Sequence, residues 1–273
     1  MKIATIRTED GTRAAVLDGG KLVPLEFEDV GSWLQAGSPD WSDHVAGTPL
    51  STEEADFAPV VPRPGKIICV GLNYRDHILE MGRELPEYPT LFAKFSDSLI
   101  GAHDDIVLPP GSSSIDWEGE LAVFIGTSVS RADEAQARNA VAGFAVANDV
   151  SARDFQRRTP EWLQGKTFDR TTPLGPYLVT VDETGTEPDL DISCAVDGIT
   201  KQHSRTSELV FGPLALIQYI SAITTLRPGD VILTGTPGGV GDGRNPKEFL
   251  DRGSVLETSI NTLGATANRC IVE

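Results

Sequence analysis

Short apolar runs rich in β-branched and aromatic residues recur along the chain and are separated by Gly, Pro, Asn and Asp. Such runs are typical of buried strands, and we expect strands at residues 66–70, 88–95, 118–125, 141–150, 177–181, 191–196 and 231–235. Apolar residues at helical spacing predict helices at residues 30–35, 132–141 and 209–223, with another beginning at Asp76. The pattern predicts a β-rich mixed α/β fold.

The first 60 residues look like a small α+β domain of their own. A strand at residues 2–7 precedes a hairpin over 13–25 that turns at Asp18-Gly-Gly20, and the short helix at 30–35 follows. Three prolines between residues 59 and 65 mark a boundary. We therefore predict an N-terminal domain over residues 1–60 and a catalytic domain over 61–273.

Composition and charge exclude several classes of protein. The 273 residues carry a formal net charge of −17, which argues against binding to a nucleic acid backbone. No apolar run is long enough to span a membrane, and we see no signal peptide at the N-terminus. The three cysteines lie far apart and form neither a disulfide framework nor a zinc motif. We expect a cytoplasmic protein.

Three acids stand at the ends of apolar strands. Glu118 and Glu120 are two apart, so they point to the same face of one predicted strand. Asp149 ends a second apolar run. A shared proton or open water would also relieve the repulsion between the carboxylates, but the run Leu121-Ala-Val-Phe-Ile125 is too apolar for an exposed edge. Oxygen ligands without His or Cys predict one Mg²⁺ or Mn²⁺ ion, with positions left open for substrate.

A candidate base lies on the helix that begins at Asp76. His77 and Glu80 are three residues apart, so they share a helix face and can form a hydrogen bond. A histidine oriented by a carboxylate is a common general base, although an ordinary surface pair has the same spacing. The polar, proline-broken segment 81–89 is expected to be a mobile loop that closes over substrate.

Basic residues cluster in the same part of the chain. Lys94 lies inside an apolar strand, and Arg157, Arg158 and Lys166 follow the strand end at Asp149. Such cations can hold an anionic ligand near a metal, or each can be a solvated or structural residue. The Gly-rich segment 236–241 lacks the lysine of a nucleotide-binding loop. Its N–H groups either approach a ligand carboxylate or form an ordinary turn.

Taken in order, these motifs resemble the fumarylacetoacetate hydrolase family. The resemblance covers about residues 60 to 270 and rests on an ordered set of motifs rather than on any single one. The motifs are Gly71-Leu-Asn-Tyr-x-Asp-His77 with Glu80, Asp116-x-Glu-x-Glu120, Asn148-Asp-Val-Ser-Ala-Arg-Asp-x-Gln156, Gly165-Lys-x-Phe-Asp169 and Thr234-Gly-Thr-Pro-x-Gly-Val-Gly241.

The resemblance implies a mixed β-roll, a homodimer and a defined set of site residues. It implies that the metal ligands are Glu118, Glu120 and Asp149, and that His77 and Glu80 form the dyad that activates water. Lys166 is implied as a group that holds a substrate oxygen, and we expect its positive charge to stabilise the developing oxyanion. The implied substrate contacts are Lys94, Gln156, Thr236 and Tyr74.

The activity implied is hydrolysis of a carbon–carbon bond in a 2,4-dioxo acid. An acylpyruvate such as fumarylpyruvate would give pyruvate and a carboxylic acid, as in the catabolism of aromatic compounds, and the partner would be a small 2-oxo acid. The same pocket would also suit oxaloacetate decarboxylation, 2-hydroxyhepta-2,4-diene-1,7-dioate isomerisation or hydration of a 2-oxo-alkenoate. A catalytically silent metal or ligand binder is the alternative from another class.

Overall fold

The computed structural model describes residues 1–80, 82 and 84–273, without the side chains of His77 and Glu80. The helices are α1 (Val30–Gln35), α2 (Arg75–Glu80), α3 (Glu134–Ala140), α4 (Arg153–Gln156), α5 (Leu163–Lys166), α6 (Val181–Thr184) and α7 (Pro213–Ile223), with 3₁₀ turns η1 (Trp41–His44), η2 (Ser96–Ser98), η3 (Thr206–Glu208) and η4 (Gly241–Gly243). The strands are β1 (Lys2–Thr8), β2 (Gly11–Asp18), β3 (Lys21–Pro24), β4 (Leu50–Ser51), β5 (Asp56–Phe57), β6 (Ile67–Gly71), β7 (Thr90–Lys94), β8 (Leu99–Ile100), β9 (Ile106–Val107), β10 (Ile115–Asp116), β11 (Gly119–Ile125), β12 (Val141–Asn148), β13 (Ser151–Ala152), β14 (Thr172–Thr180), β15 (Asp191–Val196), β16 (Ile199–Arg205), β17 (Val231–Leu233), β18 (Val255–Ile260) and β19 (Gly264–Ile271).

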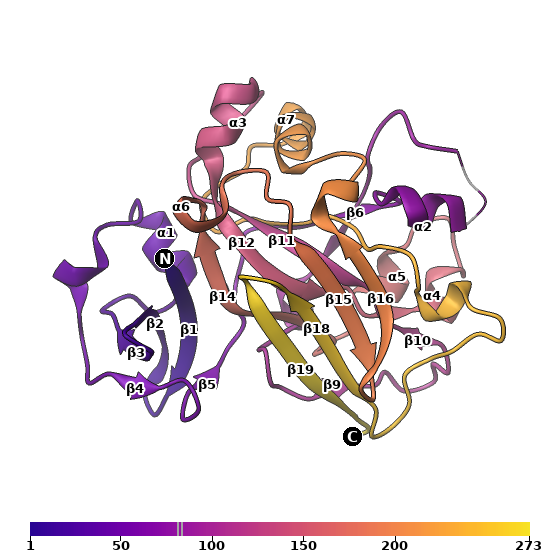
Figure 1. The fold of residues 1–273 in the computed structure, drawn as a ribbon, viewed down its shortest axis with the longest axis horizontal. Coiled ribbons are helices and arrows are strands. Elements are labelled where there is room, and N and C mark those ends of the chain that lie inside the picture. The colour runs from indigo at the N-terminus through magenta and orange to yellow at the C-terminus, as the bar shows by residue number, and fades with distance from the viewer. Residues whose placement is uncertain (81, 83) are drawn as a thin grey trace.

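Two sheets form the body of the molecule. Over the described residues, the larger sheet has twelve strands in the order β4-β3-β2-β1-β14-β12-β11-β17-β6-β7, with β5 beside β1 and β8 beside β14. The second has five in the order β16-β15-β18-β19-β9, and β10 pairs separately with β13. Figure 1 shows strands β15, β16, β18 and β19 of the second sheet, orange to yellow, in front of the central strands, with α3 and α7 together at one end. The β-rich mixed α/β fold is confirmed.

Strand β11 lies at the centre because both of its faces are apolar. Ala122 and Phe124 pack into a core that includes Ile3 and Leu174, whereas Val123 packs into another core with Leu214. Successive side chains of a strand point to opposite faces, so a continuous apolar run is buried on both sides. Fully burying one such large side chain contributes about 1.5–3 kcal/mol. This packing fixes the position of the acids at the start of β11.

Helix α7 covers one end of the sheet through a regular apolar stripe. Leu214, Ile217 and Ile220 are buried and spaced by three residues. The helix begins at Pro213, in its first turn, which is a favoured position because proline lacks an N–H donor. The predicted helix at 209–223 was therefore wrong at its start, because apolar spacing alone does not locate the first turn.

The N-terminal strands join the larger sheet directly. Strand β1 pairs antiparallel with β14, with Ile3 opposite Leu178. The segment after β5 is packed rather than free: Val60 N–H donates to the Leu174 carbonyl over 3.1 Å, and the Val60 carbonyl accepts from Thr5 Oγ1 over 2.6 Å. The division into domains at residue 60 stays a prediction. Among the described residues, no helix has the length and apolar character that crossing a bilayer requires.

Replacing Gly101 by alanine tests this junction. A Cβ atom there would lie 1.9 Å from the Phe57 carbonyl oxygen, so β5 and the segment after β8 must separate. We expect the free energy of unfolding to fall by about 2 kcal/mol, as for an overpacked site. Gly212→Ala is the control, because its nearest neighbour is the flexible end of Glu187 at 3.2 Å. Equal stability of the two variants in chemical denaturation would contradict the prediction.

Candidate active site

Antiparallel pairing of β11 with β12 brings the three predicted ligands together. Gly119 lies opposite Asn148, so Glu118, one residue before Gly119, and Asp149, one residue after Asn148, become neighbours. The Asp149 N–H donates to the Glu118 carbonyl over 2.8 Å. Ligand oxygens of Glu118, Glu120 and Asp149 lie within 4.8 Å of one another, and all three residues are buried. We call these three residues the acidic triad.

The triad carries more negative charge than its surroundings favour. Burial, and then the carboxylates of Asp149 and Glu118, raise the pKa of Glu120 well above its usual range. The Gly235 N–H donates to Glu120 Oε2 over 2.8 Å, but one neutral donor does not offset two nearby anions. The ionised triad therefore needs cations close by.

Two buried lysines supply part of that positive charge. Lys166 Nζ lies 2.5 Å from Glu118 Oε2 and 2.9 Å from Asp149 Oδ2, and Lys94 Nζ lies 2.6 Å from Asp149 Oδ1. Burial alone would lower the pKa of Lys166, but Asp149 and Glu118 outweigh burial and raise that pKa. Lys166 is therefore a fixed ammonium group rather than a base.

Arg153 and Asp116 form a second buried pair beside the triad. Arg153 Nε donates to Asp116 Oδ2 over 2.8 Å, its Nη2 lies 2.6 Å from Glu118 Oε1, and its Nη1 donates to Gln156 Oε1 over 3.0 Å. Neither Arg153 nor Asp116 is among the site residues predicted from the sequence, although both lie in its motifs. The sequence offers one indication for Asp116. Asp116, Glu118 and Glu120 follow the two-residue period of a strand, which would place Asp116 on the same face as the two ligands.

Thr236 is positioned by the strands beneath it. Its hydroxyl donates to the Gly119 carbonyl over 2.9 Å and accepts from the Gln202 amide over 2.7 Å. Further along the same loop, the Gly241 N–H donates to Asp116 Oδ1 over 2.7 Å. The Gly-rich loop is thus tied both to the start of β11 and to the Arg153 pair.

The donor set fits a hard divalent cation. It consists of carboxylate oxygens, with no imidazole or thiolate in the triad. Of the buried charged groups around the site, the four acids Asp116, Glu118, Glu120 and Asp149 outnumber the three bases Lys94, Arg153 and Lys166 by one. A divalent cation would therefore leave the site with a small positive excess, which suits an anionic substrate.

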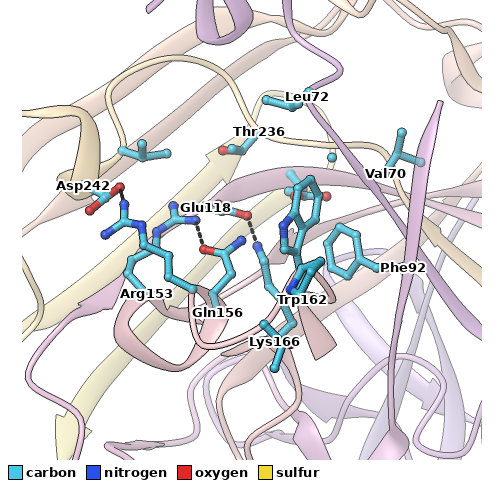
Figure 2. Close-up of a pocket in the computed structure, with 16 residues that line it drawn as sticks. Val70, Leu72, Phe92, Glu118, Arg153, Gln156, Trp162, Lys166, Thr236 and Asp242 are labelled. Atoms are coloured by element: carbon cyan, nitrogen blue, oxygen red, sulfur yellow. Dashed lines mark hydrogen bonds and ion pairs between the residues drawn. The ribbon is translucent and has the colours of Figure 1, made fainter. Parts of the chain in front are cut away.

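A cavity of about 300 Å³ opens beside the triad. Figure 2 shows an apolar side formed by Val70, Leu72, Phe92 and Trp162 and a polar side formed by Arg153, Gln156 and Asp242, with Glu118 and Lys166 between them. Among the described residues, the lining consists of Val70, Gly71, Leu72, Phe92, Glu118, Glu120, Arg153, Gln156, Arg157, Thr159, Pro160, Trp162, Lys166, Thr236, Val240 and Asp242.

The apolar side is built on a close contact. A Cβ atom at Gly71 would lie 2.2 Å from Trp162 Cζ3, so only glycine lets the indole pack here. The next residue, Leu72, has a φ of 55°, in the left-handed region that non-glycine residues rarely adopt. Trp162 also meets the Phe92 ring edge-on at 5.5 Å between centroids. Strained backbone of this kind is common at ligand-binding sites.

The structure brings most predicted site residues to this cavity. Glu118, Glu120, Gln156, Lys166 and Thr236 line it. Asp149 belongs to the triad without being among the described lining residues.

Lys94 and Tyr74 are fully or nearly fully buried and are not among the described lining residues. The Tyr74 hydroxyl is buried without a hydrogen-bond partner in the described part of the chain, and burial raises its pKa. The predicted substrate contacts of these two residues stay predictions.

The predicted dyad lies partly outside the described residues. The backbone of His77 and Glu80 belongs to α2, but their side chains are not described, and neither are Met81 and Arg83 of the predicted closing loop. Helix α2 is held near the Gly-rich loop, because the Gly238 N–H donates to Asp76 Oδ2 over 3.3 Å. The dyad stays a prediction.

Comparison with known proteins identifies the class. Residues 66–271 match the model of the fumarylacetoacetate (FAA) hydrolase C-terminal domain, so the chain belongs to the fumarylacetoacetate hydrolase family. The mitochondrial oxaloacetate tautomerase Fahd2a of Rattus norvegicus is 47% identical over 271 residues, covering 96% of this chain and 86% of that protein.

Solved structures of two enzymes share the fold. A 2-hydroxyhepta-2,4-diene-1,7-dioate isomerase from Mycobacterium marinum has a TM-score of 0.83 at 30% identity, covering 100% of this chain and 99% of that one. A fumarylpyruvate hydrolase from Pseudomonas aeruginosa, in complex with Mn²⁺ and pyruvate, has a TM-score of 0.71 at 31% identity. The match covers 80% of this chain and 92% of that one. The family is one of enzymes, and it includes hydrolases, isomerases and tautomerases.

Proposed function

We propose that this protein is a metal-dependent enzyme that enolises a short 2-oxo acid, with the keto–enol interconversion of oxaloacetate as its reaction. The observation that carries the proposal is the fixed ammonium of Lys166 beside the acidic triad, on the floor of a cavity. The oxaloacetate tautomerase of rat, similar over nearly the whole chain, supports the choice of substrate.

The proposed cofactor is one Mg²⁺ or Mn²⁺ ion per subunit, held by Glu118, Glu120 and Asp149. When bound, such an ion supplies Lewis-acid polarisation of the 2-oxo group. The Mn²⁺ in the Pseudomonas aeruginosa hydrolase supports this choice.

The residues around the ion are assigned the remaining tasks. Lys166 stabilises the negative charge that develops on the 2-oxo oxygen, because a preorganised cation in a buried site needs no rearrangement as charge forms. Gln156 and Thr236 orient the substrate oxygens. His77, oriented by Glu80, transfers the proton at C3. The apolar side at Phe92 and Trp162 limits the water around the carbon chain.

Hydrolysis of an acylpyruvate is the second candidate. It uses the same groups at the carboxylate end, with His77 activating a water molecule that attacks the C4 carbonyl. The fumarylpyruvate hydrolase with bound pyruvate supports it. A homodimer and a cytoplasmic location complete the proposal, although the rat relative is named as mitochondrial.

A substrate panel separates the two reactions. The protein is assayed with Mn²⁺ on enol oxaloacetate, followed by its ultraviolet absorbance, and on acylpyruvates, followed by pyruvate release; carbon dioxide release is measured in parallel. We expect the protein to accelerate the keto–enol equilibration of oxaloacetate and to release little carbon dioxide. Removal of the Mn²⁺ by a chelator should abolish the acceleration. Cleavage of acylpyruvates without any effect on oxaloacetate would favour the second candidate, and activity on neither would contradict both.

His77→Ala tests the proposed proton carrier. Loss of a general base slows catalysis by about 10²-fold or more, so we expect turnover to fall by about that factor. Metal affinity should stay unchanged, because His77 is not in the triad. His103→Ala, in a loop outside the cavity, is the matched control. Wild-type turnover in the His77 variant would exclude its proposed role.

A further inference from the structure

The cavity has a cation that the proposed reaction does not use. Arg157 lines the cavity and forms an ion pair with Asp242, and its side chain is 53% exposed. The other cations among the described lining residues are Arg153 and Lys166. Both form ion pairs with buried acids, Arg153 with Asp116 and Glu118 and Lys166 with Glu118. Lys166 is already assigned to the developing negative charge on the substrate, and drawing Arg153 away would remove the ion pair of the buried Asp116, which is costly. Arg157 is not restrained in this way.

Asp242 has a second cationic partner. Its Oδ1 accepts from Lys247 Nζ over 2.7 Å, and its own N–H donates to Asp116 Oδ2 over 3.0 Å, so the main chain fixes its position. The Asp242 side chain is only 6% exposed. If Arg157 turns to a ligand, Asp242 keeps Lys247 as a partner, and no buried charge is left alone.

We propose that Arg157 binds a second carboxylate, at the end of the substrate remote from the triad, and so makes the enzyme selective for 2-oxo dicarboxylic acids. This inference rests on the proposed function, because it takes the first carboxylate to lie at the triad. The planar guanidinium matches a carboxylate with two parallel hydrogen bonds.

The shape of the cavity supports this direction. Figure 2 shows Asp242 on the polar side, beyond Arg153 and Gln156 and away from Phe92 and Trp162. The carbon chain of the substrate would lie against the apolar side, while its far carboxylate reaches the polar side. A substrate that ends in a methyl group would leave Arg157 paired with Asp242 and gain nothing from it.

The neighbouring residue provides a matched control. Arg158 carries the same charge on the same short segment, but its guanidinium carbon lies 3.4 Å from the centroid of the Phe155 ring. Arg158 is not among the described residues that line the cavity. Arg157→Gln and Arg158→Gln therefore remove equal charge and differ in access to the substrate.

The experiment compares two ligands that differ by one carboxylate. Malate and lactate share a carboxylate and a 2-hydroxyl group, and their binding to the Mn²⁺-loaded protein is measured by calorimetry. We expect Arg157→Gln to weaken malate binding by about tenfold, the effect of one charge-assisted contact, and to leave lactate unchanged. Arg158→Gln should change neither. For turnover, Arg157→Gln should raise KM for oxaloacetate with kcat nearly unchanged.

Lys247→Gln provides a test from outside the cavity. Without Lys247, Asp242 holds Arg157 more strongly, so malate binding should weaken several-fold while lactate binding stays constant. Equal losses for malate and lactate, or no loss of malate binding in Arg157→Gln, would overturn the inference. Malate binding does not depend on turnover, so it tests the role of Arg157 separately from the proposed reaction. A wild-type protein that is inactive on oxaloacetate but binds malate more tightly than lactate would contradict only the proposed function.

Discussion

We expect Glu120→Gln to weaken metal binding at the acidic triad by about 10²-fold or more and to reduce turnover by about 10³-fold. In the wild type the Gly235 N–H donates to Glu120 Oε2 over 2.8 Å. The change to glutamine keeps the shape of the side chain and an oxygen that can accept this hydrogen bond. It removes one of three anionic ligands. Loss of a group that merely supports a ligand costs 10–100-fold in affinity, so loss of a ligand should cost about 10²-fold or more.

Calorimetric titration with Mn²⁺ and the oxaloacetate assay measure the two effects. Glu134→Gln is the matched control, because Glu134 is exposed on α3 and pairs with Arg138 four residues later. It should bind metal and turn over as the wild type does. If the Glu120 variant keeps wild-type affinity for Mn²⁺, the triad is not the metal site.

Lys166→Met separates metal binding from catalysis. We expect turnover to fall by about 10²–10³-fold, the effect of losing one preorganised group that stabilises an oxyanion. Metal affinity should not fall. In the wild type the Lys166 ammonium lies 2.5 Å from Glu118 Oε2, so it competes with the metal ion for that oxygen. Methionine keeps an apolar stem beside the Phe92 ring, where Nζ lies 5.1 Å from the centroid.

Lys201→Met is the control for that variant. Lys201 is also largely buried and pairs with Glu248 over 2.5 Å, but it does not belong to the described lining. Its loss should leave turnover near the wild-type value. A Lys166 variant with full turnover, or one that loses Mn²⁺ binding, would contradict the role assigned to Lys166.

Much of this site could be predicted because local period and residue type carry the information. The two-residue spacing of Glu118 and Glu120 predicted a common direction, and the apolar run after them predicted a buried strand. Glu118 itself precedes β11, so the prediction that both acids lie within one strand was slightly wrong. The direction still held because the backbone stays paired there, with the Asp149 N–H bound to the Glu118 carbonyl.

Distances between remote residues could not be predicted from the sequence. Periodicity gives the face of a strand but not its partner, so it did not show that Lys94 packs behind Asp149 rather than along the cavity. The Arg153–Asp116 pair joins residues 37 apart, with strands β11, β12 and β13 and helix α3 between them in the sequence. Only the register of the strands places such groups within hydrogen-bonding distance.

The most direct test is a crystal structure of the protein grown with Mn²⁺, with the ion located by its anomalous scattering. We expect one peak bounded by carboxylate oxygens of Glu118, Glu120 and Asp149, at about 2.1 Å from each, as for a small octahedral dication. A peak elsewhere, or none, with Glu118 and Asp149 still paired to their lysines, would contradict the account.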